Sequence, residues 1–189
     1  MKVLLVEPNF PIPPKSKNHR DFLPVGLLKL ASYHREKGDE VKLVRGNQYF
    51  SDFHPNQIKI TSLFTYWSNY VWESVKFYKE TYPKAKIIVG GIYASLMPEH
   101  CKQSGCNEVF EGVDERVEKF KPAYNLVDVD YQIVHTSRGC LRKCKFCGTW
   151  RIEPKFTSKK SIKDEICSNR VIFYDNNLLA NPYIKDILE

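Results

Sequence analysis

The stretch MKVLLVEPNF, residues 1–10, decides the fold, because an uninterrupted apolar run lies between Lys2 and Glu7 and Pro8 comes directly after it. A short run of this kind is typical of a strand buried on both faces of a parallel sheet. The run is short and lacks a small-residue cleavage site, so it does not predict a signal peptide. We therefore expect the chain to begin with a buried strand over residues 2–7.

Strand-like and helix-like segments alternate after this first strand. Further strands are expected over 40–44, 57–64, 84–91 and 107–112, and helices over 23–38 (closed by Gly38), 69–83 (ended by Pro83) and 95–105. Such alternation predicts an open parallel α/β sheet with right-handed crossovers. No GxGxxG motif is present, so the sequence lacks a dinucleotide-binding fingerprint.

Ligands of open α/β sheets lie beyond the carboxyl ends of the strands. In this chain those ends are expected at residues 7–10, 62–67 and 90–94. The pair Gly90 and Gly91 permits close approach of the backbone to a ligand, which makes both residues candidates for cofactor binding. A plain turn explains the two glycines equally well.

The pattern weakens after Gly112, where residues 115–130 predict a charged linker with one short helix and a turn. A strand over 131–140 is then expected to run into a cysteine cluster. After the cluster we expect a helix over 158–169, a strand over 170–177 and the start of a helix over 181–189. The predicted organisation is thus an α/β domain over 1–114, a linker over 115–130 and the start of a second domain over 131–189.

Composition bounds the class of protein. The 189 residues carry a formal charge of +7, and no stretch approaches the ~18 apolar residues that span a bilayer. We expect a cytoplasmic protein with reduced thiols and no membrane association. Between residues 138 and 163 only Glu153 opposes a set of basic residues: Arg138, Arg142, Lys143, Lys145, Arg151, Lys155, Lys159, Lys160 and Lys163. This local bias favours an anionic ligand over a nucleic acid, because no nucleic-acid-binding motif accompanies it.

The stretch SRGCLRKCKFCGTW, residues 137–150, spaces Cys140, Cys144 and Cys147 as C-x3-C-x2-C. In a reducing compartment such a cluster indicates a metal or redox site. Structural zinc takes four protein ligands, and His135 or Cys167 could supply the fourth. A cubane iron–sulfur cluster held by three cysteines would instead leave one iron open for an outside ligand. Cys101, Cys106 and Cys167 are otherwise interpreted as structural cysteines.

The cysteine loop, preceded by TSRG and with Phe146 just before its last cysteine, resembles the cluster loop of the radical S-adenosylmethionine superfamily. The upstream segments VLLVEPNFP, FLPVGLLKLASYHREKGDEVKLV, AKIIVGGIYASLMPE and VFEG resemble the N-terminal domain of the cobalamin-binding branch of that superfamily. The segments KFTSKKSIKDEI and VIFYDNNLLANP are similar to the part of this branch that lies after the cluster loop. The resemblance covers nearly the whole chain, and the cysteine loop is its most specific part.

The resemblance implies that Cys140, Cys144 and Cys147 ligate a 4Fe-4S cluster whose fourth iron is chelated by S-adenosylmethionine. Reduction by a one-electron donor such as flavodoxin or ferredoxin would release a 5′-deoxyadenosyl radical, which makes the chain part of an oxidoreductase-type radical enzyme. It also implies that Phe146 flanks the adenine. Three further residues would lie near the amino group of the cofactor: Asp175, Asn176 and Asn177. No residue of this chain is predicted to be catalytic in its own right.

Two features depart from the family. Where cobalamin-binding relatives carry DxHxxG after the first strand, this chain has EPNFPIPP, and the near match at residues 52–57 has Gln57 in place of glycine. His54 is therefore interpreted as an ordinary loop histidine, and cobalamin remains a candidate cofactor without a protein ligand to cobalt. The aromatic residues Phe64, Tyr66, Trp67, Tyr70 and Trp72 could line a corrin-sized pocket, although core packing explains most of them better.

The second departure is length. The family's barrel has about six βα units and only about two are expected here, so the chain looks truncated within the barrel, or a second chain completes it. Two alternatives to a radical enzyme stay open. One is a non-catalytic iron–sulfur or cobalamin binding module, and the other is a zinc-stabilised α/β protein.

Overall fold

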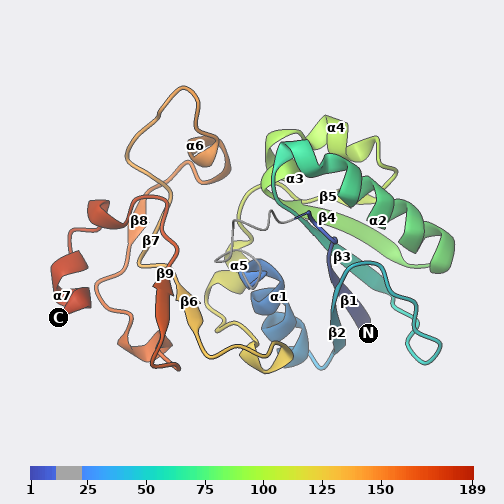
Figure 1. Ribbon diagram of the computed structural model, residues 1–189, viewed down its shortest axis with the longest axis horizontal. Helices are drawn as coiled ribbons and strands as arrows, with labels where there is room; N and C mark the ends of the chain where they lie inside the picture. Colours follow the sequence, from blue (N-terminus) through green and yellow to red (C-terminus); the bar gives the residue numbers. More distant parts are fainter. Residues whose placement is uncertain (12–22) are drawn as a thin grey trace. The chain divides into compact units, whose positions relative to one another are not determined.

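The computed structural model describes residues 1–11 and 23–189, so the segment EPNFPIPP lies partly outside the described residues. The chain divides into two compact units, Met1–Leu126 and Val127–Glu189 (Figure 1). No helix in the described ranges is long and apolar enough to cross a bilayer.

Unit 1, Met1–Leu126, is built on one five-stranded sheet with the strand order β2-β1-β3-β4-β5. All four strand pairings are parallel. The strands are β1 (Lys2–Glu7), β2 (Glu40–Arg45), β3 (Gln57–Ser62), β4 (Lys86–Gly91) and β5 (Glu108–Val109). The predicted open parallel α/β sheet is confirmed. Because β2 lies on one side of β1 and β3 on its other side, the strand order reverses between β1 and β3.

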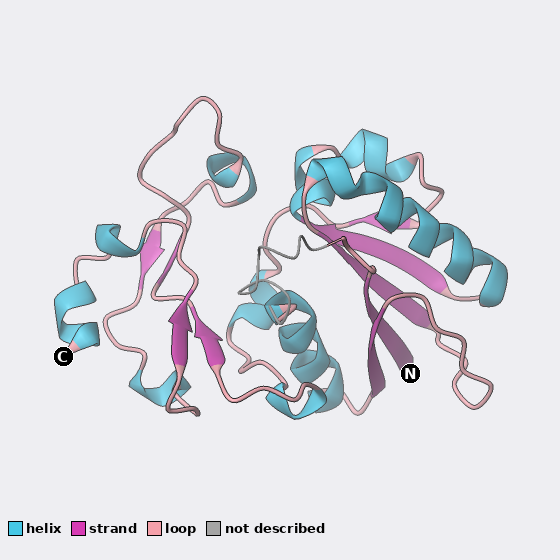
Figure 2. Ribbon diagram, viewed as in Figure 1, coloured by secondary structure: helices cyan, strands magenta, loops and turns pink. Residues whose placement is uncertain are grey.

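Helices cover both faces of this sheet (Figure 2). Successive side chains of β1 point to opposite faces, so Val3 and Leu5 pack with Leu27 and Ala31 of α1, while Leu4 and Val6 join a larger cluster. That larger cluster includes Val71, Val75 and Tyr78 of α2. The continuous apolar run of β1 thus has its physical reason in burial on both faces.

The two long helices end where the sequence indicates. In α1 (Val25–Glu36), the N–H of Gly38 donates to Arg35 O at 2.9 Å and that of Asp39 to His34 O at 3.0 Å. Gly38 adopts φ +76°, and this pair of bonds is a Schellman motif that satisfies the last carbonyls. The second helix, α2 (Ser68–Thr81), comes after the 3-10 turn η1 (Thr65–Trp67) and ends before Pro83.

The region after β4 differs from the expected single helix over 95–105. Two short helices form instead, α3 (Ile92–Leu96) and α4 (Pro98–Lys102). Met97 separates them with φ −135° and ψ 58°, because the residue before a proline is driven out of the helical region. The expected strand over 107–112 is reduced to β5 at the edge of the sheet, and α5 (Glu115–Glu118) and the 3-10 turn η2 (Tyr124–Leu126) complete the unit.

Unit 2, Val127–Glu189, contains two small sheets. β6 (Gln132–Val134) pairs in parallel with β9 (Val171–Phe173), and β7 (Ser137–Arg138) pairs antiparallel with β8 (Thr157–Ser158). Its remaining elements are short: the helices α6 (Thr149–Ile152) and α7 (Ile184–Leu188), and the 3-10 turns η3 (Lys163–Glu165) and η4 (Leu178–Ala180). The continuation into a barrel stays a prediction.

Two predictions for unit 2 are wrong. The expected strand over 131–140 breaks into β6 and β7, because the N–H groups of Thr136 and Ser137 donate to the Asp175 carboxylate instead of a strand. The expected helix over 158–169 is absent. Gln132, which is 2% exposed, accepts the N–H groups of Cys167 and Ser168, which a helix would have used, and it donates to Glu165 O.

Candidate functional site

The cysteine loop of unit 2 leaves β7 and returns to β8. The antiparallel pairs Ser137 with Ser158 and Arg138 with Thr157 close its base. Gly139 begins the loop with φ +72°, and a Cβ built there would lie 2.3 Å from Lys155 O. A residue with a side chain would therefore collide with the backbone of the segment that leads into β8, so glycine is required between β7 and Cys140.

Glu153 holds the two sides of this base together. Its Oε2 accepts the N–H of Gly139 at 2.5 Å, and its Oε1 lies 3.3 Å from Arg138 Nη1. The side chain is 12% exposed, so the pair is shielded from water and these bonds are stronger than at the surface. Asn176 Nδ2 also donates to Glu153 Oε2 at 3.3 Å. The one acidic residue in the basic stretch is thus a structural anchor of the loop.

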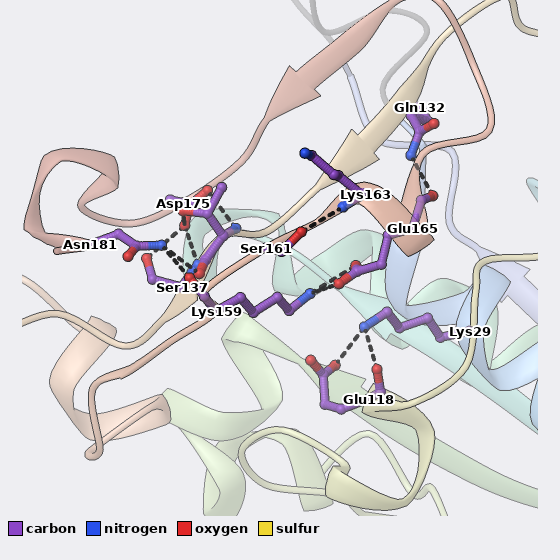
Figure 3. Close-up of polar contacts among 11 residues, drawn as sticks. Lys29, Glu118, Gln132, Ser137, Lys159, Ser161, Lys163, Glu165, Asp175 and Asn181 are labelled. Atoms are coloured by element: carbon purple, nitrogen blue, oxygen red, sulfur yellow. Dashed lines mark hydrogen bonds and ion pairs between the residues drawn. The ribbon is translucent and has the colours of Figure 1, made fainter. Parts of the chain in front are cut away.

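Asp175 holds the segment that leads into the loop. Its carboxylate accepts bonds from the N–H and hydroxyl of Thr136 at 3.1 and 2.9 Å, and from the N–H and hydroxyl of Ser137 at 2.5 and 2.6 Å. Figure 3 shows Asp175 beside Ser137, with Asn181 nearby. Asn181 Nδ2 donates to the carbonyl oxygens of Thr136 and Lys159. The carboxylate that the resemblance assigns to the cofactor is therefore already occupied by four donors of the chain.

The other two residues assigned to the cofactor reach the cysteine loop. Asn177 Nδ2 lies 3.7 Å from Cys140 Sγ, and Asn176 Oδ1 lies 3.3 Å from Thr149 Oγ1. The structure thus brings the end of β9 alongside the cysteine loop. Phe146, by contrast, is 94% exposed. A solvent-exposed aromatic side chain in the cysteine loop has apolar surface available for a ligand.

Each of the three loop thiols is free and half-buried. Cys140 Sγ accepts the N–H of Arg142 at 3.4 Å, and Cys147 Sγ lies 3.3 Å from Thr149 Oγ1. Hydrogen bonds from the hydroxyl and the N–H of Thr149 lower the pKa of the Cys147 thiol. This favours the thiolate, which is the form that binds metal.

The donor chemistry of the loop fits an iron–sulfur cluster, since three free thiols lie on one segment and hydrogen-bond donors contact two of them. Within residues 1–11 and 23–189, however, no three His, Cys, Asp or Glu side chains are gathered closely enough to hold a metal ion. The structure does not bring His135 or Cys167 to the loop as a fourth zinc ligand. The His135 ring packs 5.8 Å from that of Tyr174, and Cys167 is exposed.

In unit 1 the candidate site is the carboxyl edge of the sheet. Glu7, at the end of β1, forms an ion pair with Arg45, and burial raises the pKa of its carboxyl. Phe10 stacks on Trp67 with ring centroids 5.3 Å apart. Phe64 and Tyr66 stack 5.0 Å apart yet are 45% and 69% exposed. Core packing thus accounts for Trp67 and Tyr70, which contact the core, but not for Phe64 and Tyr66.

Of the two glycines at this edge, Gly91 has a packing role. A Cβ on Gly91 would lie 2.3 Å from Ser62 O, and Gly91 adopts φ +104°. Ser62, which is buried, donates to Gly90 O at 2.8 Å and accepts the N–H of Ala94 at 3.0 Å. The close backbone approach at Gly91 is therefore to β3. His54 is exposed in the loop between β2 and β3, and its ring centroid lies 6.4 Å from that of Tyr82.

Several residues that support the cysteine loop could not be identified from the sequence. Glu153 stood out only as the sole acid in a basic stretch, and nothing marked Gln132 or Asn181. Polar residues that bond to distant backbone groups leave no periodic pattern, so sequence reasoning had no means of finding them.

No model of a known protein family matches the chain, and no curated protein matches it either. Among solved structures, the chain is similar to a cobalamin-binding protein from Desulfitobacterium hafniense DCB-2, with 16% sequence identity and a TM-score of 0.40. The alignment covers 57% of this chain and 50% of that one, so the chain spans half the length of that protein.

Proposed function

We propose that this chain binds a 4Fe-4S cluster through Cys140, Cys144 and Cys147 and forms part of a radical S-adenosylmethionine enzyme. The observation that carries the proposal is the loop itself. Three free thiols lie on one segment whose ends are tied by β7, β8 and Glu153. A segment fixed at its base and irregular between its ends can close around a metal centre, as metal sites that order on binding do.

Donors from the chain support the anionic centre. Asn177 Nδ2 and the N–H of Arg142 point to Cys140 Sγ, and Thr149 lies against Cys147 Sγ. Hydrogen bonds to cluster sulfurs raise the reduction potential and stabilise the charge. Three basic residues of the loop offer a docking surface to an acidic one-electron donor protein: Arg142, Lys143 and Lys145.

Around S-adenosylmethionine we assign Asn176 and Asn177 to polar contacts and Phe146 to the adenine. The bound cluster would supply the electron that cleaves the sulfonium. Asp175 is assigned a positioning role, because its oxygens already accept bonds from Thr136 and Ser137. Its part is to hold the start of the loop and the Asn pair in place. The remainder of the barrel would come from a second chain.

The test is anaerobic reconstitution with iron and sulfide, followed by dithionite reduction with S-adenosylmethionine and measurement of 5′-deoxyadenosine. We expect the reconstituted chain to form deoxyadenosine, and Cys144→Ala to form none. Cys167→Ala, which alters an exposed cysteine outside the loop, is the matched control and should form as much as the parent. Cluster binding without deoxyadenosine would instead identify a non-catalytic binding module.

Cobalamin is a second candidate ligand, in unit 1, favoured by the exposed stacked pair Phe64 and Tyr66 at the carboxyl edge of the sheet. The stacked rings of Phe64 and Tyr66 offer a flat apolar surface of the kind that a corrin could cover. Titration with hydroxocobalamin, monitored by its absorbance, tests this. Tyr66→Ala should weaken binding about tenfold, corresponding to ~1.4 kcal/mol. Tyr49→Ala removes a similarly exposed tyrosine and should leave binding unchanged.

A further inference from the structure

Unit 1 contains a second pair of thiols, outside the cysteine loop. Cys101 belongs to α4 and is fully buried in the larger core cluster, and the half-buried Cys106 packs against the same cluster. The Cys106 thiol donates to Cys101 O at 3.8 Å. Neither residue has a role in the proposed cluster site, and both are free thiols.

A tight turn holds the two cysteines together. After α4, the N–H of Ser104 donates to Cys101 O at 3.1 Å and that of Gly105 donates to Lys102 O at 3.0 Å. Gly105 adopts φ +85°, which reverses the chain, and Lys79 Nζ caps its carbonyl at 3.1 Å. The turn therefore returns Cys106 to the side of Cys101 in the folded protein.

The two thiols differ in acidity. A hydrogen bond from the Cys101 thiol lowers the pKa of Cys106 to about 6, and bonds from Ser104 act in the same direction. That hydrogen bond, together with burial, raises the pKa of Cys101. Cys106 is therefore the more acidic thiol of the pair and the half-buried one, which solvent reaches, and Cys101 beside it stays protonated. A nucleophilic thiolate next to a second thiol is the arrangement of a redox-active cysteine pair.

We propose that Cys106 and Cys101 form a hydroperoxide-sensitive dithiol that closes to a disulfide. The Cys106 thiolate attacks one oxygen of a hydroperoxide, so the O–O bond breaks, the sulfur is oxidised to a sulfenic acid and an alcohol or water leaves. Cys101 Sγ then attacks the Cys106 sulfur, the S–O bond breaks, and the Cys101 proton leaves with the hydroxide as water. Two thiols and one hydrogen peroxide thus give one disulfide and two waters.

Peptide mapping of the intact chain tests the proposal directly, because trypsin cuts between the two cysteines at Lys102. Peptides 87–102 and 103–116 each carry one cysteine. After a brief treatment with hydrogen peroxide and alkylation of the remaining thiols, we expect the two peptides joined, two hydrogens lighter than their sum, and separated again by dithiothreitol. Recovery of both peptides alkylated and unlinked, or of Cys106 joined to another cysteine, would overturn the proposal.

Variants assign the order of the steps. In Cys101→Ala the Cys106 sulfenic acid has no resolving thiol, so labelling of peptide 103–116 by dimedone should rise at least tenfold. In Cys106→Ser the buried Cys101 should stay unoxidised under the same treatment. Cys167→Ser is the matched control and should leave the linked peptide unchanged. Oxidation of Cys101 at the parental rate in Cys106→Ser would show that Cys106 is not the attacking thiol. Peptide mapping of the unsubstituted chain still tests the proposal if a variant fails to fold.

Discussion

At the scale of single residues, Gly91 shows how a packing constraint can resemble a ligand site. Its missing side chain leaves room for the backbone of Ser62, and its φ of +104° suits few other residues. Gly91→Ala should lower the free energy of unfolding by about 2–4 kcal/mol, since strain and overlap add. Urea unfolding, with hydrogen exchange in β3 and β4 to localise the effect, measures this.

Gly26→Ala is the matched control, because nothing lies within 4 Å of a Cβ at this position in α1. It should raise stability by up to about 1 kcal/mol, as a helical Gly→Ala change does. An equal loss in both variants would show that the approach of Gly91 to Ser62 is not the reason for glycine at this position.

Asp175 is a second residue whose hydrogen bonds should determine local stability. Asp175→Asn replaces a carboxylate by an amide whose Nδ2 faces the donors of Thr136 and Ser137. Unit 2 should lose about 1–3 kcal/mol of stability, the cost of buried donors without acceptors. The exposed Asp164→Asn, which removes the same charge, should change stability by less than about 0.5 kcal/mol. Similar effects of both substitutions would indicate that the charge alone matters.

At the scale of elements, sequence reasoning succeeded where packing and local signals agree. The apolar run of β1, Gly38 after α1 and Pro83 after α2 each reflect a local physical rule, and the structure obeys them. It failed at residues 158–169, where helical propensity gave way to the buried amide of Gln132. It also failed at Thr136, where Asp175 takes donors that a strand would use. These competing bonds join residues more than thirty positions apart, and no local pattern reports them.

The residues of the candidate site likewise fall into those that the sequence could predict and those that it could not. Cys140, Cys144 and Cys147 were visible from their spacing, and Asn177 only through the resemblance to the radical S-adenosylmethionine superfamily. The supports of the loop were not. Gly139 is needed because of Lys155 O, and Glu153 because of the Gly139 N–H, so their roles exist only once β7 and β8 have paired.

The C-terminal end of α1 carries a pH-sensitive contact. Asp39 bonds both the Met1 amino group and His34 Nδ1 at 2.7 Å. Burial lowers the pKa of His34 from 6.5, an effect that the Asp39 bond opposes without reversing it. The unfolded chain therefore binds more protons than the folded one once the pH falls below about 6.5, so the stability contributed by neutral His34 is present above that pH and is lost as acid is added.

His34→Gln should reduce the dependence of the free energy of unfolding on pH in this range. Urea unfolding of the parent between pH 7.5 and 5.5 should show a decline that is smaller in His34→Gln. The stability of His54→Gln, which alters an exposed histidine, should decline as that of the parent does. A parent and a His34 variant with the same slope would contradict the assignment.

At the scale of the whole molecule, each of the two compact units contains one of the two candidate sites. The cysteine loop belongs to Val127–Glu189 and the sheet edge to Met1–Leu126. If a cluster binds the loop, its stabilisation should appear in unit 2. Reconstitution should raise hydrogen-exchange protection at least tenfold, ~1.4 kcal/mol, in residues 140–152 and leave the amides of β1–β4 unchanged. Protection gained equally across both units, or in unit 1 alone, would place the metal elsewhere.

The iron and acid-labile sulfide content of the anaerobically reconstituted chain measures cluster binding most directly. We expect about four of each per chain, as for a cubane cluster. The variant carrying Cys140→Ala, Cys144→Ala and Cys147→Ala should contain almost none, while Cys167→Ala should match the parent. Undiminished iron and sulfide in the triple variant, or a colourless parent saturated with zinc, would contradict this expectation.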